Sequence, residues 1–287
     1  DPKNRQVQIE MEQACTNHLK EIGGYLYPIF RPVDFSSHTF EYEASVIIPV
    51  RNRIRTIKDA IRSVLNQKTD FKFNLIVIDN HSTDGTTDAI REFASDDRLI
   101  HILPERNDLG IGGCWNLGVH HDKCGKFAVQ LDSDDVYKDE NTLKTMVNAF
   151  YEQNCAMVVG TYMMTDFNMN MIAPGIIDHK EWTPENGRNN ALRINGLGAP
   201  RAFYTPVLRE VKVPNTSYGE DYALGLNFSR QYQIGRVYDV VYNCRRWDDN
   251  SDASLDIVKM NGHNLYKDRI RTWELQARVA MNKKNKK

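Results

Sequence analysis

The segment Ala44–Asn80, ASVIIPVRNRIRTIKDAIRSVLNQKTDFKFNLIVIDN, carries the clearest structural pattern of the chain. It opens and closes with β-branched runs, Ala44–Val50 and Asn74–Asn80, which are typical of buried strands. Between them the apolar residues of segment 57–65 recur every three or four positions, as on one face of a helix. A strand, an amphipathic helix and a second strand in this order predict the start of a parallel sheet.

The alternation continues as far as about Val159. Further strand-like runs are Leu99–Leu103, Lys126–Asp132 and Ala156–Tyr162, and shorter helical patterns fill segments 89–94 and 143–151. We therefore predict an α/β fold with a mostly parallel central sheet flanked by helices. Because ligands bind such sheets at the carboxyl ends of the strands, polar residues that follow the strands are candidate site residues.

The remaining segments are less regular. Residues 163–200 are polar, rich in Pro and Gly and weakly periodic, which indicates long loops or an irregular edge. A helix is expected at Glu220–Gln231, a strand at Arg236–Tyr242 and a C-terminal helix over about 262–281. We expect three parts: an N-terminal extension with a helix and an extended segment (1–42), the α/β domain (43–251) and a C-terminal helical extension (252–287).

Composition excludes several classes of protein. The chain has 287 residues, a formal net charge of −1 and 41% hydrophobic residues, which is ordinary for a globular protein and gives no reason to expect nucleic-acid binding. No apolar run approaches the roughly 18 residues of a membrane span, and no signal-peptide pattern opens the chain. The first residue is Asp1 rather than Met, as expected of a trimmed chain or of one domain of a longer protein.

Two further features bear on location. The five cysteines are scattered and form no C-x-x-C pair, so a zinc site or disulfide framework is not indicated and a reducing cytoplasm is expected. The terminal KKNKK is a solvated tail or, alternatively, a weak contact with an anionic membrane, which would place the protein at the inner face of that membrane.

The densest cluster of acids lies in KFAVQLDSDDVYKDEN, Lys126–Asn141. Asp132 and Asp134 directly follow a buried strand and offer hard oxygen ligands, which suit Mg²⁺ or Mn²⁺ better than zinc. Magnesium usually takes one or two carboxylates together with phosphate oxygens, so the pattern favours a metal bound to a nucleotide. Asp135 and Asp139 are explained as turn and cap residues of the helix that begins near Asn141.

Other strand ends carry candidates as well. Asn52 follows the first strand in PVRNR and can cap the next helix. Asp79 ends the second strand, where a carboxylate can accept a hydrogen bond from a nucleobase. The glycine-rich LGIGGCWNLG has Trp115 where the dinucleotide-binding fingerprint requires glycine, so that fingerprint is absent, although its glycines can allow close packing.

A last pair of acids opens the predicted helix at residue 220. Glu220 and Asp221 in YGEDYAL would interact favourably with the dipole at the start of the helix, and this structural role alone could account for both acids. The other is that one of them is a general base for an acceptor hydroxyl.

Taken together, SVIIPVRN, VIDNHSTDGT, LGIGGCWNLG, VQLDSDD and YGEDYAL resemble, in order and spacing, the motifs of family 2 glycosyltransferases with the GT-A fold. The resemblance covers roughly residues 43–251. The motif before the first helix, which lies along the nucleoside in that family, is matched by Pro49, Val50, Arg51 and Asn52. Asp79 matches the aspartate that contacts the base, with Asn80 beside it.

The resemblance also implies a metal site and a base. Asp132, Ser133 and Asp134 match the D-x-D motif, in which Asp132 would lie near the ribose and Asp134 would bind Mn²⁺ or Mg²⁺ on the diphosphate. Asp221 matches the catalytic base, with Glu220 beside it. Arg246 lies in a C-terminal segment that would approach the donor diphosphate, and Trp182 and Trp247 are either sugar-stacking platforms or partly buried structural residues.

The activity so implied is an inverting transfer of a sugar from a nucleotide-diphospho-sugar, with UDP the expected nucleotide, to the hydroxyl of a glycan or lipid-linked glycan, as in polysaccharide biosynthesis. Two alternatives stay open. One is a nucleotidyltransferase that resembles sugar-nucleotide pyrophosphorylases, although PVRNRIRT lacks the glycines of that class. The other is a catalytically silent module that binds nucleotides or glycans.

Overall fold

The structure is a computed structural model that describes residues 4–194, 197–247 and 255–285. The described helices are α1 (Arg5–Glu21), α2 (Ile57–Leu65), α3 (Thr86–Arg91), α4 (Ile111–Val119), α5 (Thr142–Gln153), α6 (Gly187–Asn190), α7 (Thr205–Val211), α8 (Glu220–Gln231) and α9 (Ile257–Asn285). The described strands are β1 (Ala44–Val50), β2 (Phe73–Asp79), β3 (Leu99–Ile102), β4 (Phe127–Gln130), β5 (Val136–Tyr137), β6 (Met157–Thr165), β7 (Met171–Ile177), β8 (Arg201–Tyr204) and β9 (Ile234–Arg245).

These strands form one sheet with the order β3-β2-β1-β4-β8-β6-β9-β5, and β7 pairs with β6 outside this path. The four strands β3, β2, β1 and β4 are parallel to one another. Ala44 of β1 lies opposite Phe73 of β2 on one side and Phe127 of β4 on the other. The short β8 then runs antiparallel between β4 and β6. β9 is parallel to β6, whereas β5 is antiparallel to β9. The predicted α/β architecture is confirmed, but the sheet is mixed because β8, β7 and β5 enter it in the reverse direction.

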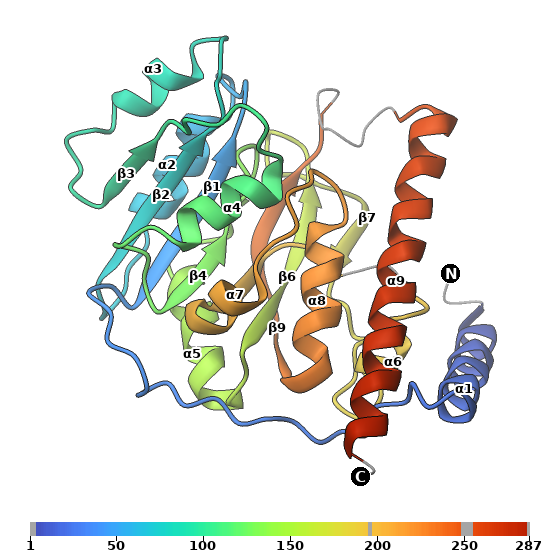
Figure 1. The fold of residues 1–287 in the computed structure, drawn as a ribbon. Helices are drawn as coiled ribbons and strands as arrows, with labels where there is room; N and C mark the ends of the chain where they lie inside the picture. Colours follow the sequence, from blue (N-terminus) through green and yellow to red (C-terminus); the bar gives the residue numbers. More distant parts are fainter. Residues whose placement is uncertain (1–3, 195–196, 248–254, 286–287) are drawn as a thin grey trace.

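Helices cover both faces of the sheet (Figure 1). α4, α7 and α8 lie over the face turned to the viewer in Figure 1, and α5 contacts β4, β6 and β9. Both faces are apolar: the side chains of Ile47, Ile48 and Val77 in the parallel half have no exposed surface. Burial of such continuous apolar strands on two sides is the main favourable contribution to the stability of a parallel sheet.

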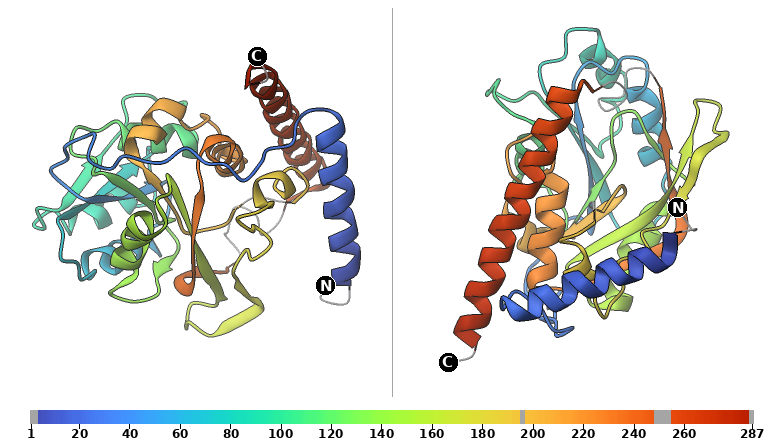
Figure 2. Two further views of the ribbon diagram at one scale, coloured as in Figure 1. Left: turned by 90° about the horizontal axis from the view of Figure 1, so that it is seen from below. Right: turned by 90° about the vertical axis from the view of Figure 1, so that its right-hand side faces the viewer.

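The two terminal helices lie at one side of the molecule (Figure 2). α9 runs along α8, and α1 packs against α6. Contacts here are polar as well as apolar: Asn189 exchanges hydrogen bonds of 2.9 Å with both backbone groups of Leu26. Within the described residues, no helix combines the length and apolarity that crossing a membrane requires.

The predicted elements of the α/β region are confirmed, with boundaries that shift by a few residues. α8 begins and ends where the sequence predicts, whereas β9 and α9 are both longer than predicted. The irregular segment 163–200 contains two elements that weak periodicity did not predict: the strand β7, which pairs with the end of β6, and the short helix α6. The predicted boundary between residues 251 and 252 lies outside the described residues.

Candidate active site

A cleft of about 520 Å³ opens at the carboxyl ends of the central strands. β1 contributes Pro49, the turn after β4 contributes residues 132–135, and β9 and the residue after it contribute Cys244 and Arg246. The first turn of α8, with Glu220 and Asp221, also lines the cleft. Acids that are far apart in the sequence, and that were predicted separately, therefore line one cavity.

The turn after β4 is held in place by Asp135. Its nearly buried carboxylate accepts a hydrogen bond of 2.7 Å from the backbone N–H of Arg245 in β9. Burial, together with the charges of Asp132 and Asp134, raises the pKa of Asp135 well above its ordinary value. The prediction that Asp135 caps the next helix is thus wrong, because its side chain points to β9. Asp139 does make the local turn, accepting from the N–H of Asn141 just before α5.

Asp132 is held in the cleft by two hydrogen bonds. Its Oδ1 accepts from Nε2 of Gln130 (2.8 Å), and its backbone N–H donates to the hydroxyl of Tyr242 (3.1 Å). Burial raises the pKa of Asp132, which the positive charge of Arg201 opposes and the negative charge of Asp134 reinforces. The raised pKa means that the carboxylate form of Asp132 is held at a cost here, and a cation in the cleft would stabilise it.

Asp134 faces cationic and N–H groups. Nε of Arg53 lies 3.6 Å from its Oδ2, and the indole Nε1 of Trp247 donates to the same oxygen at 3.4 Å. Within the described part of the chain, no group of three or more His, Cys, Asp or Glu side chains is arranged to hold a metal. The residues present, two hard carboxylates beside open space, fit a divalent ion that takes its other ligands from a bound diphosphate and water.

Glu220 and Asp221 have different surroundings. Oδ2 of Asp221 lies 3.1 Å from Nη1 of Arg201, and its Oδ1 accepts from the N–H of Tyr222. Burial, reinforced by the charge of Asp221, raises the pKa of Glu220 to about 7. The pair thus offers one carboxylate fixed by a cation and one that titrates near neutral pH, an arrangement that suits proton transfer.

A smaller cavity of about 230 Å³ adjoins the cleft and shares Pro49, Arg53 and Ser133 with it. Val50, Arg51 and Asn80 also line it, so these predicted donor-site residues lie together. Nδ2 of Asn80 donates to the carbonyl of Leu109 (2.8 Å), which leaves its buried Oδ1 without a partner among the described residues. A fixed acceptor of this kind in a pocket selects a ligand that carries an N–H group.

Two predicted donor-site residues, Asp79 and Asn52, line neither cavity in this structure. Asp79 has no exposed surface, and its oxygens accept from the N–H of Ser82 (3.1 Å) and the hydroxyl of Thr87 (2.5 Å). To contact a base, Asp79 would have to give up these bonds, whereas Asn80 already faces the cavity. Asn52, with φ 54°, accepts from the N–H of Thr83 (2.8 Å) and so does not cap α2, which begins after Thr56.

The glycines of the segment 109–118 serve close packing, as expected. A Cβ on Gly112 would lie 1.8 Å from the carbonyl oxygen of Pro214, and one on Gly113 would lie 2.2 Å from Oδ1 of Asn215. A Cβ on Gly110 would likewise approach the backbone of Thr216. The start of α4 therefore rests directly on the loop 213–217 that leads to Glu220 and Asp221.

Several cleft residues have no counterpart in the sequence predictions. Arg201 comes from β8, in a segment with no readable pattern, and Tyr162 and Tyr218 come from β6 and the loop before α8. Arg53, which also lines the cleft, could have been found from the sequence, because it is a basic residue that directly follows a strand-end motif. Of the two tryptophans considered as platforms, Trp247 lies beside Asp134, whereas Trp182 lines a separate cavity.

A family model described as Glycosyl transferase family 2 matches residues 45–205. The chain is 29% identical over 200 residues to the UDP-Glc:alpha-D-GlcNAc-diphosphoundecaprenol beta-1,3-glucosyltransferase WfgD of Escherichia coli, a match over 69% of this chain and 74% of that protein. Two further curated glycosyltransferases are matched over only 40% and 46% of their own length.

Solved structures are similar in fold. Residues 1–349 of Staphylococcus aureus TarS in complex with UDP-GlcNAc align with a TM-score of 0.62 and 19% identity, over 81% of this chain and 71% of that one. The mannosyltransferase PcManGT of Pyrobaculum calidifontis, in complex with GDP-Man and Mn²⁺, aligns with a TM-score of 0.56 and 16% identity, over 96% and 82%. At these identities the likeness concerns the fold alone.

Proposed function

The chain belongs to glycosyl transferase family 2, and we propose that it is an inverting, metal-dependent enzyme that transfers a sugar from a nucleotide-diphospho-sugar to the hydroxyl of a glycan or lipid-linked glycan. The observation that carries the proposal is the cleft itself. It is lined both by Asp132 and Asp134, which follow a central strand, and by Asp221, at the start of α8. Membership of the family argues against the nucleotidyltransferase alternative.

The nucleoside would occupy the smaller cavity. Its walls come from Pro49, Val50 and Arg51, and Oδ1 of Asn80 is an acceptor for a ring N–H. Uracil carries such a group at N3 and guanine at N1, whereas cytosine has none. UDP is the nucleotide we propose, in keeping with the donor named for WfgD and the ligand named for TarS.

The diphosphate would lie between the two cavities, where Ser133 and Arg53 belong to both. Asp134 and Asp132 would hold Mn²⁺ or Mg²⁺ there. When bound, the metal supplies positive charge that stabilises the departing diphosphate. Arg246 lines the same cleft and offers a guanidinium for phosphate oxygens, a geometry that lysine does not reproduce.

Asp221 would take the proton from the acceptor hydroxyl as that oxygen attacks the anomeric carbon on the face opposite the leaving group. The bond to the diphosphate oxygen breaks in the same displacement, so that configuration inverts and no covalent enzyme intermediate is needed. Arg201 fixes the orientation of Asp221. Contact of the C-terminal basic tail with an anionic membrane, where lipid-linked acceptors lie, stays a proposal, and residues 286–287 of that tail lie outside the described residues.

The experiment that tests the function is a panel of UDP-, GDP- and dTDP-sugars, measured for Mn²⁺-dependent binding and hydrolysis. Wild type should bind at least one donor in a metal-dependent manner, and Asp134→Ala should lose that dependence. Asp88→Ala removes an exposed acid of α3 and should behave as wild type. If no donor binds, or if Asp134→Ala responds to the metal as wild type does, the proposal fails.

A second variant separates binding from chemistry. Asp221→Asn should retain donor binding while its kcat falls by about 10²-fold to 10⁴-fold, the usual contribution of a general base. Full transfer by Asp221→Asn would remove Asp221 from this role. A silent binding module would instead show donor binding with no turnover in wild type.

A further inference from the structure

A third cavity, of about 280 Å³, lies at the opposite end of the sheet from the active-site cleft. Ile234 at the start of β9 lines it, and Cys244 near the end of the same strand lines the cleft. At roughly 3.3 Å per residue the strand between them spans about 30 Å, so the two cavities are separate sites.

The walls of the third cavity are aromatic and cationic. Four rings line it, those of Phe30, Trp182, Tyr232 and Tyr238, together with Arg188 and Arg236. The guanidinium of Arg188 lies 4.6 Å from the centre of the Phe30 ring, and that of Arg236 lies 5.3 Å from the centre of the Tyr238 ring. Among the described residues that line the cavity, no side chain is acidic.

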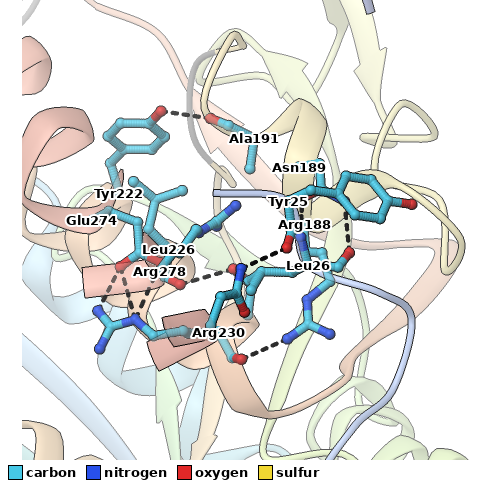
Figure 3. Close-up of polar contacts among 12 residues, drawn as sticks. Tyr25, Leu26, Arg188, Asn189, Ala191, Tyr222, Leu226, Arg230, Glu274 and Arg278 are labelled. Carbon is cyan, nitrogen blue, oxygen red and sulfur yellow. Dashed lines mark hydrogen bonds and ion pairs between the residues drawn. The ribbon is translucent and has the colours of Figure 1, made fainter. Parts of the chain in front are cut away.

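Both arginines are held by backbone carbonyls rather than by carboxylates. Arg188 donates through Nη1 to Tyr27 (2.7 Å) and Ile29 (3.0 Å), and through Nη2 to Arg230 (2.6 Å; Figure 3). Arg236 donates through its two terminal nitrogens to His179 (2.8 Å) and Asp178. Neither set of bonds neutralises the positive charge, although burial lowers the pKa of Arg188 to about 10.

Three buried N–H donors of this lining have no acceptor within the described part of the chain. They are Nε of Arg188, Nε of Arg236 and the indole Nε1 of Trp182. Trp182 and Arg236 are held by the same group, because the backbone N–H of Trp182 and Nη1 of Arg236 both donate to the carbonyl of His179. Two acids, Asp178 and Glu181, interact electrostatically with Arg236. Asp178 pairs with Lys180 (2.6 Å), and Glu181 pairs with His179 (3.4 Å). Unpartnered buried donors mark a place where a ligand supplies the acceptor.

We propose that this cavity is a second binding site, for a sugar ring that carries an oxyanion, either a carboxylate or a phosphate. The two Nε–H groups and the indole N–H would donate to the anionic oxygens, and the aromatic rings would pack against the apolar faces of the sugar ring. The site lies outside the active-site cleft, and the proposal does not depend on the function proposed for that cleft.

The test follows the indole N–H signals of the four tryptophans by NMR while a probe is added. The probes are D-glucuronate, glucose 6-phosphate, glucose and inorganic phosphate. The signal of Trp182 should shift with the first two and not with glucose. Inorganic phosphate, which lacks the ring, should bind at least about tenfold more weakly than the better of the two sugar acids. Whichever sugar acid binds more tightly identifies the oxyanion.

The signal of Trp247 reports the other cleft, because its indole donates to Asp134. It should respond to UDP with metal and stay in place with the sugar acids, so a failure of either site is seen independently of the other. Trp182→Phe assigns the Trp182 signal, keeps the aromatic wall and should weaken binding of the sugar acid about tenfold. Trp273→Phe, an exposed tryptophan of α9, is the matched control and should not change that binding.

Tyr238→Ser keeps the test decisive if Trp182→Phe does not fold, because the Tyr238 side chain is half exposed. It should weaken the sugar acids and leave binding of inorganic phosphate unchanged. The proposal is overturned if neither sugar acid moves the Trp182 signal, if glucose binds as tightly as the acids, or if inorganic phosphate does.

Discussion

Nη1 of Arg201 lies 3.1 Å from Oδ2 of Asp221, so a cation on the short antiparallel strand β8 meets the carboxylate that opens α8. The same nitrogen donates to the carbonyl of Leu197 at 2.6 Å, which fixes the guanidinium on a second side. Because the side chain of Asp221 is only partly exposed, this contact and the bond from the N–H of Tyr222 restrict the orientation of its carboxylate. Arg201 is thereby a positioning residue for the proposed base.

Arg201→Gln should therefore lower kcat about tenfold to hundredfold, because the lost interaction orients the base. It should raise the donor KM by a smaller factor, because the same charge also opposes the raised pKa of Asp132. Steady-state kinetics at saturating acceptor measure both constants. Arg201→Lys, which keeps the charge, should recover part of the loss. An unchanged kcat in Arg201→Gln would show that Asp221 needs no fixed orientation.

The pH dependence of transfer should follow Glu220, whose pKa burial raises to about 7. As pH rises through about 7, Glu220 loses its proton, and the new negative charge favours transfer of the acceptor proton into this pair of carboxylates. We expect kcat/KM to rise across this range in wild type and to lose that inflection in Glu220→Gln. The positive charge of Arg201 lowers the pKa of Glu220, so Arg201→Gln should move the inflection to higher pH. A profile that is the same in Glu220→Gln would exclude Glu220 as its origin.

Much of the fold follows from periodicity alone, and the reasons for the exceptions are physical. The runs around Ile47 and Val77 are continuous and β-branched, as two-sided burial requires, and they were predicted as strands. β8 spans only Arg201–Tyr204, and so short a strand has no period to read. Its reverse direction depends on pairing with β4 and β6, which are distant in sequence. The location of Arg201 therefore could not be predicted.

The acids of the site show a related limit. Asp132, Asp134 and Asp221 lie in the predicted cleft because each ends or begins a strongly patterned element. Asp79 and Asn80 are adjacent at the end of β2, and neighbouring residues of a strand point in opposite directions. Which of the two faces the ligand depends on the turn 81–87, whose Ser82 and Thr87 bind Asp79. Sequence patterns do not determine that choice.

Asp135→Asn should stabilise the protein at neutral pH. The folded state holds the proton of Asp135 more tightly than the unfolded chain does, so the favourable contribution of this group is complete at acid pH and is lost as pH rises toward its raised pKa. Asparagine avoids the buried charge and can still accept from the N–H of Arg245. Urea unfolding should show a gain of roughly 1 kcal/mol at about pH 8 and little gain near pH 4. A gain of equal size at both values would point to packing instead.

Gly112→Ala should damage both folding and transfer, since its Cβ would lie 1.8 Å from the carbonyl oxygen of Pro214. Relief of that clash moves the loop 213–217 and with it the first turn of α8. We expect a loss of stability of about 2 kcal/mol and a lower kcat, measured by thermal unfolding and kinetics. Gly262→Ala in α9 is the matched control, because its Cβ meets nothing within 4 Å; it should be neutral or slightly stabilising. If Gly112→Ala behaves like Gly262→Ala, the close packing of α4 on this loop is not required.

Asn80 should account for the choice of nucleotide base. Asn80 lines the smaller cavity, its buried Oδ1 has no partner among the described residues, and the Leu109 carbonyl fixes its Nδ2. UDP, whose base has an N3–H, can donate to this oxygen. In CDP the ring nitrogen N3 is itself an acceptor, so it and Oδ1 of Asn80 would face each other without a hydrogen between them. Wild type should therefore bind UDP about tenfold or more tightly than CDP, as titration calorimetry would measure. Asn80→Ala should bring the two affinities together by weakening UDP, whereas Asn168→Ala, at an exposed asparagine, should keep the wild-type ratio. If the ratio of the two affinities is unchanged in Asn80→Ala, discrimination between the bases arises elsewhere. Asp79 is then the residue to test, because it could contact the base once its hydrogen bonds with Ser82 and Thr87 are broken.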